Sequence, residues 1–122
     1  MTTERFTSAQ TDTAVSAVDL TGKEFFAAKR TPTGLALCGA GERCDGVISE
    51  GKAAGLHSSI KTGNQVKGVA GGAISVGDLL TPNASGKFVE AGAGDEVFGI
   101  ARSAAGAADD LVSIDVDRSS IP

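Results

Sequence analysis

Residues 34–48 read GLALCGAGERCDGVI, and residues 86–100 repeat the pattern as GKFVEAGAGDEVFGI. Each copy has a glycine, a short apolar run, Gly-Ala-Gly, an acidic residue, and a glycine followed by valine or isoleucine. Repetition on this scale is typical of one supersecondary unit that is used twice and buries a shared face. We therefore predict a degenerate internal repeat over residues 34–62 and 86–116, which suits one small barrel or sandwich because two copies are too few for a solenoid.

Short apolar runs separated by turn residues continue along the rest of the chain. They recur at roughly eight to twelve residues, a spacing typical of small all-β domains. Seventeen glycines against three prolines favour tight turns between short strands. The clearest alternation lies near the C-terminus, where Val112 and Ile114 face one way while Ser113 and Asp115 face the other. The sequence predicts an all-β fold, a small β-barrel or β-tulip-like domain with at most short helical turns.

Three local features sharpen this prediction. The runs 56–62 and 65–70 flank Gly63-Asn64, a pair typical of a β-hairpin turn. Residues 23–29 contain helix-favouring Glu, Ala and Lys, so a short helix competes there with a first strand. Residues 103–110 form either an alanine-rich helical turn or a loop.

Length and composition indicate one domain with a modest core. The chain has 122 residues, 41% of them hydrophobic and only 4% aromatic, so five Phe and small aliphatic side chains must fill the interior. We assign residues 18–122 to a single β-rich domain. Residues 1–17 are rich in Thr, Ser, Ala and Gln, with Phe6 as the largest apolar group, and we predict a flexible N-terminal arm unless a partner or a neighbouring subunit holds it.

Charge and cysteine content limit the possible partners and compartment. The formal net charge of −4 opposes binding to phosphate backbones, so no nucleic-acid partner is expected. The first residues lack the apolar core of a secretion signal, and no run approaches the length of a membrane span. Cys38 and Cys44 are expected to be reduced and partly buried, although a hairpin could bring them within bridging reach. The expected site of synthesis is therefore the cytoplasm.

Motifs that resemble nucleotide-binding loops fail in detail. The segment 46–53 approaches a phosphate-binding loop, but Ala53 stands where Ser or Thr is needed to hold magnesium. Gly39-Ala40-Gly41 and Gly92-Ala93-Gly94 lack the third glycine and the following helix of a dinucleotide fingerprint. We interpret them as turns that join strands, and we predict no cofactor.

Catalytic and metal-binding constellations fail in the same way. His57 is the only histidine, and no Gly-x-Ser-x-Gly nucleophile elbow accompanies it. The acidic pairs 95–96 and 109–110 lack the ligand spacing of a calcium loop, and Cys38, Cys44 and His57 are too few for structural zinc. The sequence therefore predicts no catalytic residue and no metal site, which makes the chain a non-enzyme that binds through its surface.

The order of these glycine motifs resembles a known family. The repeated Gly-Ala-Gly-acid pattern, together with DLTGK at 19–23, VAGGAI at 69–74 and GDLL at 77–80, is similar to the small capsid decoration, or cement, proteins of tailed bacteriophages. The likeness runs over roughly residues 18–116. It implies a compact β-rich body with an N-terminal arm that forms homotrimers or other clusters.

The same resemblance implies a location and a partner. Proteins of this class bind the major capsid protein on the outer surface of the mature head and stabilise the head against the internal pressure of packaged DNA. The chain would then be a virion protein, made in the host bacterial cytoplasm and without a membrane partner. The alternative is a β-sandwich module of phage or bacterial origin that binds protein or carbohydrate, although the chain lacks the Trp and Tyr that usually stack on sugars.

Two groups of residues are predicted to contact the capsid or a neighbouring subunit. We expect Arg5 and Phe6 to anchor the N-terminal arm. The four phenylalanines of the predicted domain are expected to divide between the core and a subunit interface, with Phe25 and Phe26 as the contact candidates. These four are Phe25, Phe26, Phe88 and Phe98.

Overall fold

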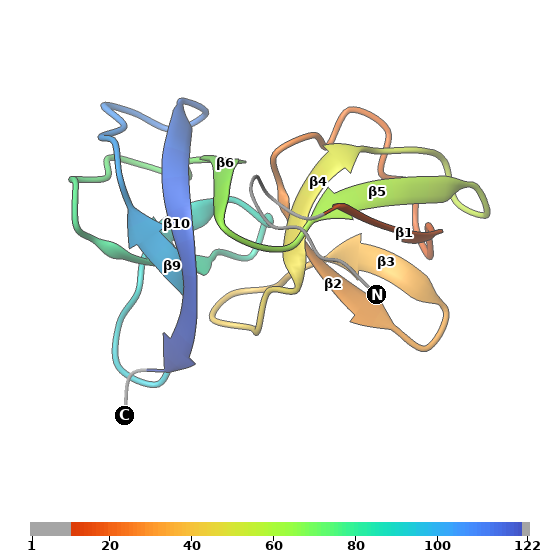
Figure 1. The fold of residues 1–122 in the computed structure, drawn as a ribbon, viewed down its shortest axis with the longest axis horizontal. Coiled ribbons are helices and arrows are strands. Elements are labelled where there is room, and N and C mark those ends of the chain that lie inside the picture. Colours follow the sequence, from red (N-terminus) through yellow and green to blue (C-terminus); the bar gives the residue numbers. More distant parts are fainter. Residues whose placement is uncertain (1–10, 121–122) are drawn as a thin grey trace, which may run out of the picture.

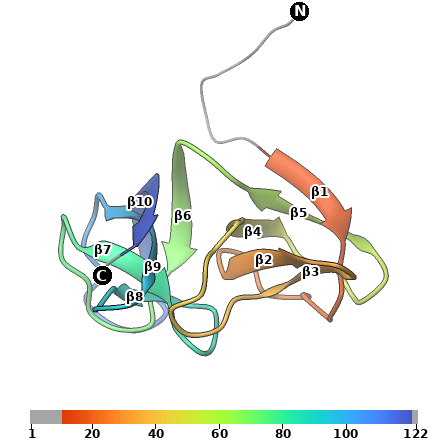
Figure 2. The same ribbon diagram turned by 90° about the horizontal axis from the view of Figure 1, so that it is seen from below.

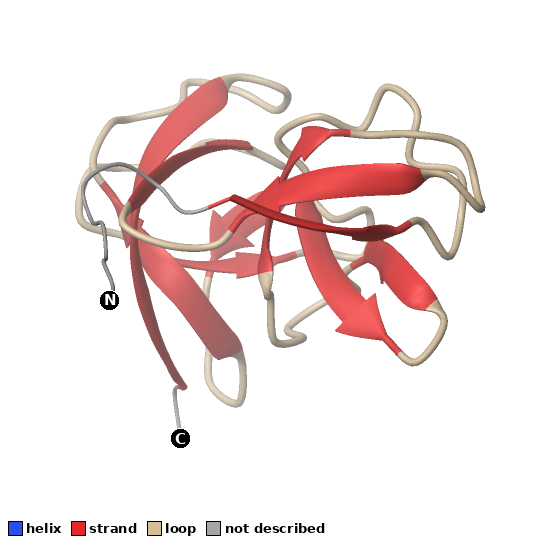
Figure 3. Ribbon diagram, turned by 45° about the vertical axis from the view of Figure 1, so that its right-hand side comes forward, coloured by secondary structure: helices blue, strands red, loops and turns tan. Residues whose placement is uncertain are grey.

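The computed structural model describes residues 11–120, which form two five-stranded antiparallel sheets (Figures 1 and 3). The first sheet contains β1 (Thr11–Val15), β2 (Ala27–Thr31), β3 (Gly34–Leu37), β4 (Gly46–Glu50) and β5 (His57–Lys61). The second contains β6 (Gln65–Val69), β7 (Leu79–Pro82), β8 (Phe88–Glu90), β9 (Glu96–Ala101) and β10 (Leu111–Ser120). Residues 11–120 contain no helix, so the predicted all-β class is confirmed, and none of their segments is a helix that could span a membrane.

The two sheets have corresponding strand orders. The first runs β1-β5-β4-β2-β3 and the second β6-β10-β9-β7-β8, so each strand of the first sheet has a counterpart five strands later. The stretches 34–48 and 86–100 lie at equivalent places, each running through the third strand of its sheet to the fourth. Figure 2 shows the sheets side by side, with β6 between β10 and the first sheet.

Neither sheet closes into a barrel. Each curls until the residue after its first strand meets the third strand, through the single parallel bridges Ser16↔Leu35 and Ala70↔Phe88. Closing a sheet into a barrel requires a ladder of several hydrogen-bonded residue pairs between the first and last strands. Strand β8 has only three residues and can form few such pairs. The expected small barrel is therefore replaced by two open, curled sheets.

The glycine before the Val/Ile step is required by close strand packing. A Cβ at Gly46 would lie 2.6 Å from the carbonyl oxygen of Lys61, and a Cβ at Gly99 would lie 2.3 Å from that of Asp115. In both sheets this contact joins the fourth strand to the fifth strand of that sheet. Only glycine lets the backbones approach this closely.

The Gly-Ala-Gly-acid motif forms the same turn twice. The Glu42 carboxylate accepts a hydrogen bond of 2.6 Å from the Gly39 amide, and the Asp95 carboxylate accepts one of 2.8 Å from the Gly92 amide. Such bonds from an acidic side chain to the backbone stabilise turns. The motif is thus a strand-joining turn.

One buried cluster joins the two sheets. Phe88 and Phe98 stack at its centre with ring centroids 5.4 Å apart. The first sheet's half of the chain contributes Ala27, Cys38, Cys44 and Val47 to this cluster. A second, smaller cluster lies within the first half and consists of Leu20, Ala28, Leu35, Ile48 and Ile60.

Arg118 and backbone hydrogen bonds also link the sheets. Its guanidinium donates to the carbonyls of Cys44 at 3.2 Å, Asp45 at 2.8 Å and Thr62 at 3.1 Å, and it lies over the Phe98 ring. The amide of Ala27 also donates to the carbonyl of the second half's Gly86 at 2.7 Å. Together with the shared core, these contacts pack the two halves into a single domain.

Two local expectations differ from the structure. Within the arm predicted over residues 1–17, Thr11–Val15 is a strand, because β5 supplies partners for its backbone; residues 1–10 lie outside the described residues. The runs beside Gly63-Asn64 do not pair as a hairpin, because β5 is already flanked by β1 and β4 while β6 pairs with β10. Where a helix was one of two alternatives, the structure has the other: residues 23–29 contain turns that lead into β2, and residues 103–110 form turns and loop.

Candidate binding groove between the sheets

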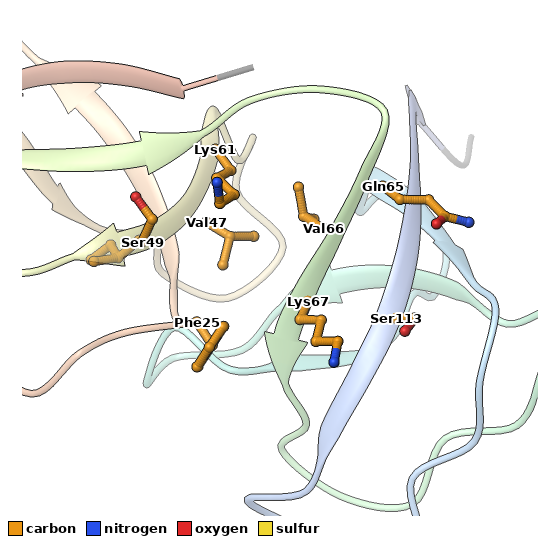
Figure 4. A pocket seen from close by; sticks show the side chains of 9 residues that line it. Phe25, Val47, Ser49, Lys61, Gln65, Val66, Lys67 and Ser113 are labelled. Atoms are coloured by element: carbon orange, nitrogen blue, oxygen red, sulfur yellow. The ribbon is translucent and has the colours of Figure 1, made fainter. Parts of the chain in front are cut away.

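A groove of about 370 Å³ opens where the two sheets meet. Figure 4 shows Phe25, Val47 and Ser49 on the side of the first sheet, and Val66 and Lys67 on the side of β6. Its floor is apolar, because Val47 and Val66 are buried core residues. The remaining lining residues are the polar Lys61, Gln65 and Ser113 and the apolar Ile48.

Phe25 owes its position to an insertion in the first half. Three more residues separate Gly22 from β2 than separate Gly77 from β7. Phe25 adopts a φ of 72°, a conformation that is strained for a non-glycine residue. Its amide donates to Ile48 O at 2.7 Å, its carbonyl accepts from Val69 N at 2.9 Å, and its side chain stays 37% exposed. The insertion therefore holds an aromatic ring at the edge of the groove.

Two lysines, Lys61 and Lys67, line the groove. Across residues 11–120, the other Lys and Arg side chains each form an ion pair, a backbone hydrogen bond or a contact with a phenyl ring. Lys61 and Lys67 have none of these contacts within that range, and both are exposed. The net charge of the chain is −4. Within residues 11–120, the two positive side chains without such contacts both lie at the groove.

The free edge of β6 also borders the groove. Val69 N donates to Phe25 O rather than to β10, and backbone groups of successive strand residues point to alternate sides. The backbone groups of Gln65 and Lys67 therefore also point away from β10. Among the strands of residues 11–120, β6 is an edge strand that pairs only with β10. An extended peptide could use such an edge for hydrogen bonds.

The predicted contact residues separate in the structure. Phe25 lines the groove, whereas Phe26 is half-buried, with Lys23 Nζ 5.1 Å from its ring centroid. Phe88 and Phe98 lie in the core. Arg5 and Phe6 lie outside the described residues.

The residues around His57 do not form a catalytic pair. His57 is exposed, while the next residue, Ser58, is fully buried because adjacent strand residues face opposite ways. The Ser58 hydroxyl is hydrogen-bonded to Ser16 Oγ at 2.5 Å and accepts from Lys52 N at 2.8 Å. The hydrogen bonds of the Ser58 hydroxyl therefore link β5 to the segments around Ser16 and Lys52.

The segment that resembles a phosphate loop has another structure. Gly46–Glu50 is strand β4, and the residues after it form turns before β5 rather than a helix. Without a helix start, its amides do not converge on a phosphate. Among residues 11–120, no group of three or more His, Cys, Asp or Glu side chains is placed to hold a metal ion.

Cys38 and Cys44 are buried, free thiols. Cys44 Sγ donates to Gly46 O at 3.0 Å. A side-chain hydrogen bond with Cys44, followed by burial, raises the pKa of the Cys38 thiol. Thiolates are the reactive form of cysteine, so the raised pKa makes the Cys38 thiol unreactive near neutral pH.

The fold has a counterpart among solved structures. The chain is similar to the crystal structure of the head fiber gp8.5 N base in bacteriophage phi29, with a TM-score of 0.72 and 21% sequence identity. The match covers 94% of this chain and 99% of that chain. This is the fold of a phage head-fiber base. No protein-family model and no curated protein sequence matches the chain.

The likeness to the head-fiber base concerns the fold as a whole. Because it spans nearly all of both chains, it includes both sheets. At 21% identity it does not transfer individual residues. The roles of Phe25, Lys61 and Lys67 therefore depend on the contacts that they make in this chain.

Sequence reasoning missed most of the groove. It selected Phe25 for its size but overlooked Lys61 and Lys67, which flank the connection between the sheets. A usable signal was present, since two lysines lie six residues apart around Gly63-Asn64 in an acidic chain. Their lack of partners becomes visible only when the ion pairs elsewhere are known.

Proposed function

We propose that this protein is a non-enzymatic decoration, or cement, protein that binds the outer surface of the mature head of a tailed phage. In this role it stabilises the head against the pressure of packaged DNA. The observation that carries the proposal is the fold, shared over 94% of the chain with a phage head-fiber base. The resemblance of the glycine motifs to phage decoration proteins supports the same role, and it rests on the sequence rather than on the fold.

The proposed partner is the major capsid protein, and the proposed assembly is a homotrimer made in the host bacterial cytoplasm and carried on the virion. A shared core and the Arg118 contacts support this role, because a stiff body transmits load between the capsid sites it joins. A trimer multiplies weak contacts, since the second and third contacts form at high effective concentration.

We propose Arg5, Phe6, Phe25 and Phe26 as residues that contact the capsid or a neighbouring subunit. Support is strongest for Phe25, which is 37% exposed although it is a large apolar side chain. Exposed aromatic groups are common anchors of interfaces. The half-buried ring of Phe26 offers less surface.

The proposal is tested by co-sedimentation. The gene's neighbours would identify a major capsid protein, and purified heads built from it would be mixed with this protein and pelleted. We expect saturable binding in a fixed ratio to the capsid protein, with heads that survive higher temperatures before releasing DNA. Absence of binding to DNA-filled heads would reject the role and leave the alternative of a module that binds another protein or a carbohydrate.

A further inference from the structure

The chain's own backbone shows how the edge of β6 can be paired. The carbonyl of Phe25 accepts a hydrogen bond of 2.9 Å from the amide of Val69, the last residue of β6. The Phe25 amide in turn donates to the carbonyl of Ile48 in β4 at 2.7 Å. Phe25 therefore bridges the two sheets at one end of the groove, and the same edge of β6 continues from there toward Gln65.

The rest of that edge offers backbone groups to a partner. Alternate residues of a strand direct their amides and carbonyls to the same side, so those of Gln65 and Lys67 point the same way as those of Val69. Within residues 11–120, no strand pairs with β6 on this side. A segment lying in line with Phe25 would meet both residues, which is the arrangement by which an extended peptide adds a strand to a sheet.

The side chains along this edge select the sequence of such a segment. Val66 is buried and, with Val47, forms the apolar floor of the groove (Figure 4). The next residue, Lys67, is exposed and points to the other face of β6, because side chains alternate along a strand. An added strand alternates in the same way. Its apolar side chains would meet the floor, and the residues between them would lie beside Lys67, where carboxylates are favoured.

Charge favours an acidic segment as the occupant. Within residues 11–120, neither Lys61 nor Lys67 forms an ion pair. Lys61 stands opposite the floor residue Val47 in the pairing of β4 with β5, so each sheet places one positive charge beside the floor. Lysines at a free strand edge also discourage pairing with the same edge of a second copy. The two lysines thus repel that edge and attract a segment that carries carboxylates.

We propose that the groove binds an extended acidic segment of a partner protein, in which carboxylates alternate with apolar side chains, and that this segment adds a strand to the free edge of β6. Its carboxylates pair with Lys61 and Lys67, and a large apolar side chain packs against the Phe25 ring and the floor. The inference goes beyond the proposed function, because it states the chemistry of the ligand whichever protein supplies it. A chain that binds phage heads but no such segment would refute this inference alone.

The first test uses a synthetic peptide, acetyl-TEVEFEVT-amide, with a fluorescent label at one end. Its control, acetyl-TEEEVFVT-amide, has the same composition and charge without the alternation. We expect the alternating peptide to bind the full chain saturably, as measured by fluorescence anisotropy, and the control to bind about tenfold more weakly because it cannot present separate apolar and acidic faces. Equal affinities would overturn the proposal. Absence of binding by both peptides would also overturn it, and would leave the lysines the role of keeping the edge unpaired.

Variants of the groove assign the contacts. Lys67→Glu should weaken binding of the alternating peptide about five- to tenfold, because an attraction becomes a repulsion. Lys52→Glu is the matched control, since it changes the net charge equally but lies outside the groove lining. Phe25→Asn removes the ring while keeping a residue that tolerates positive φ, and should also weaken binding. If Lys52→Glu weakened binding as much as Lys67→Glu, only the overall charge would matter and the proposed pairing would be wrong.

Hydrogen exchange locates the peptide without any substitution. In the free chain the amides of Gln65 and Lys67 should exchange faster than that of Val69, which already donates to Phe25, and the alternating peptide should slow both. Slow exchange of both amides in the free chain would contradict the proposal, because the edge would then be covered without a partner. Protection that appears only at high protein concentration would contradict it as well, since the occupant would be a second copy.

Discussion

The two sheets share a strand order and a turn motif but differ in what they bury. The second sheet packs Phe88 and Phe98 together, whereas the small cluster of the first half is built from aliphatic side chains and Ala28. The first half also contributes Ala27, Cys38, Cys44 and Val47 to the cluster around the second sheet. Duplication of the topology has therefore produced unequal halves: one provides the main core, and the other packs against it and carries the Phe25 insertion.

One exchange of residue sizes shows how the halves diverged. In the second half Gly68 leaves room for the Phe88 ring, since a Cβ at Gly68 would lie 2.6 Å from that ring. In the first half the equivalent residues are Ala14, which is larger than Gly68, and Leu35, which is smaller than Phe88.

The largest expected effect comes from the two matched core positions Phe88 and Leu35. Phe88→Ala should lower the free energy of unfolding by about 3–5 kcal/mol, and Leu35→Ala by about 2–4 kcal/mol, because Phe88 belongs to the cluster that both sheets share. Urea unfolding followed by circular dichroism measures both. If Leu35→Ala lowered the free energy of unfolding more than Phe88→Ala, the cluster of the first half would contribute more to stability than the shared cluster.

The second prediction compares equivalent glycines. Gly99→Ala and Gly46→Ala should each cost about 1–3 kcal/mol, since the added Cβ would meet a neighbouring backbone oxygen at 2.3 Å and 2.6 Å respectively. Gly72→Ala is the control, because nothing lies within 4 Å of its added Cβ, and it should change stability by less than about 0.5 kcal/mol. Tolerance of alanine at Gly99 would show that the strands are less tightly paired than described.

The third prediction concerns the Arg118 link between the halves. Arg118→Gln should lower the free energy of unfolding by about 1–2 kcal/mol, because three carbonyls lose a charged donor and the Phe98 ring loses its cation. The matched control is Arg102→Gln, which removes an exposed ion pair with Asp115 and should cost about 0–1 kcal/mol. Equal costs would mean that Arg118 does not join the sheets.

The smallest effect is a pH dependence carried by the first half. The folded protein raises the pKa of Cys38 above its ordinary value of 9.0, so the unfolded state loses the thiol proton first as pH rises. The contribution to stability is fully present below that ordinary value and declines as pH rises above it. Cys38→Ser should unfold with a flatter pH dependence between about pH 8 and 10. If the free energy of unfolding of Cys38→Ser depended on pH as steeply as that of the unaltered protein, a group other than Cys38 would be responsible.

Sequence reasoning predicted what is local and missed what depends on distant contacts. Alternation around Val112 and the repeated glycines at Gly46 and Gly99 indicated strands, because each signal lies within a few residues. The pairing of Thr11–Val15 with β5 and the separation of β5 from β6 depend on partners far along the chain. The groove followed the same rule, since Phe25 could be selected by type while Lys61 acquires meaning only from its surroundings.

Electron microscopy of heads with and without the protein tests the central claim most directly. The account predicts additional density on the outer surface at a repeating set of capsid positions, with a shape that accommodates both sheets and with Phe25 near the contact. Heads that look identical with and without the protein, at concentrations that saturate the co-sedimentation assay, would contradict it.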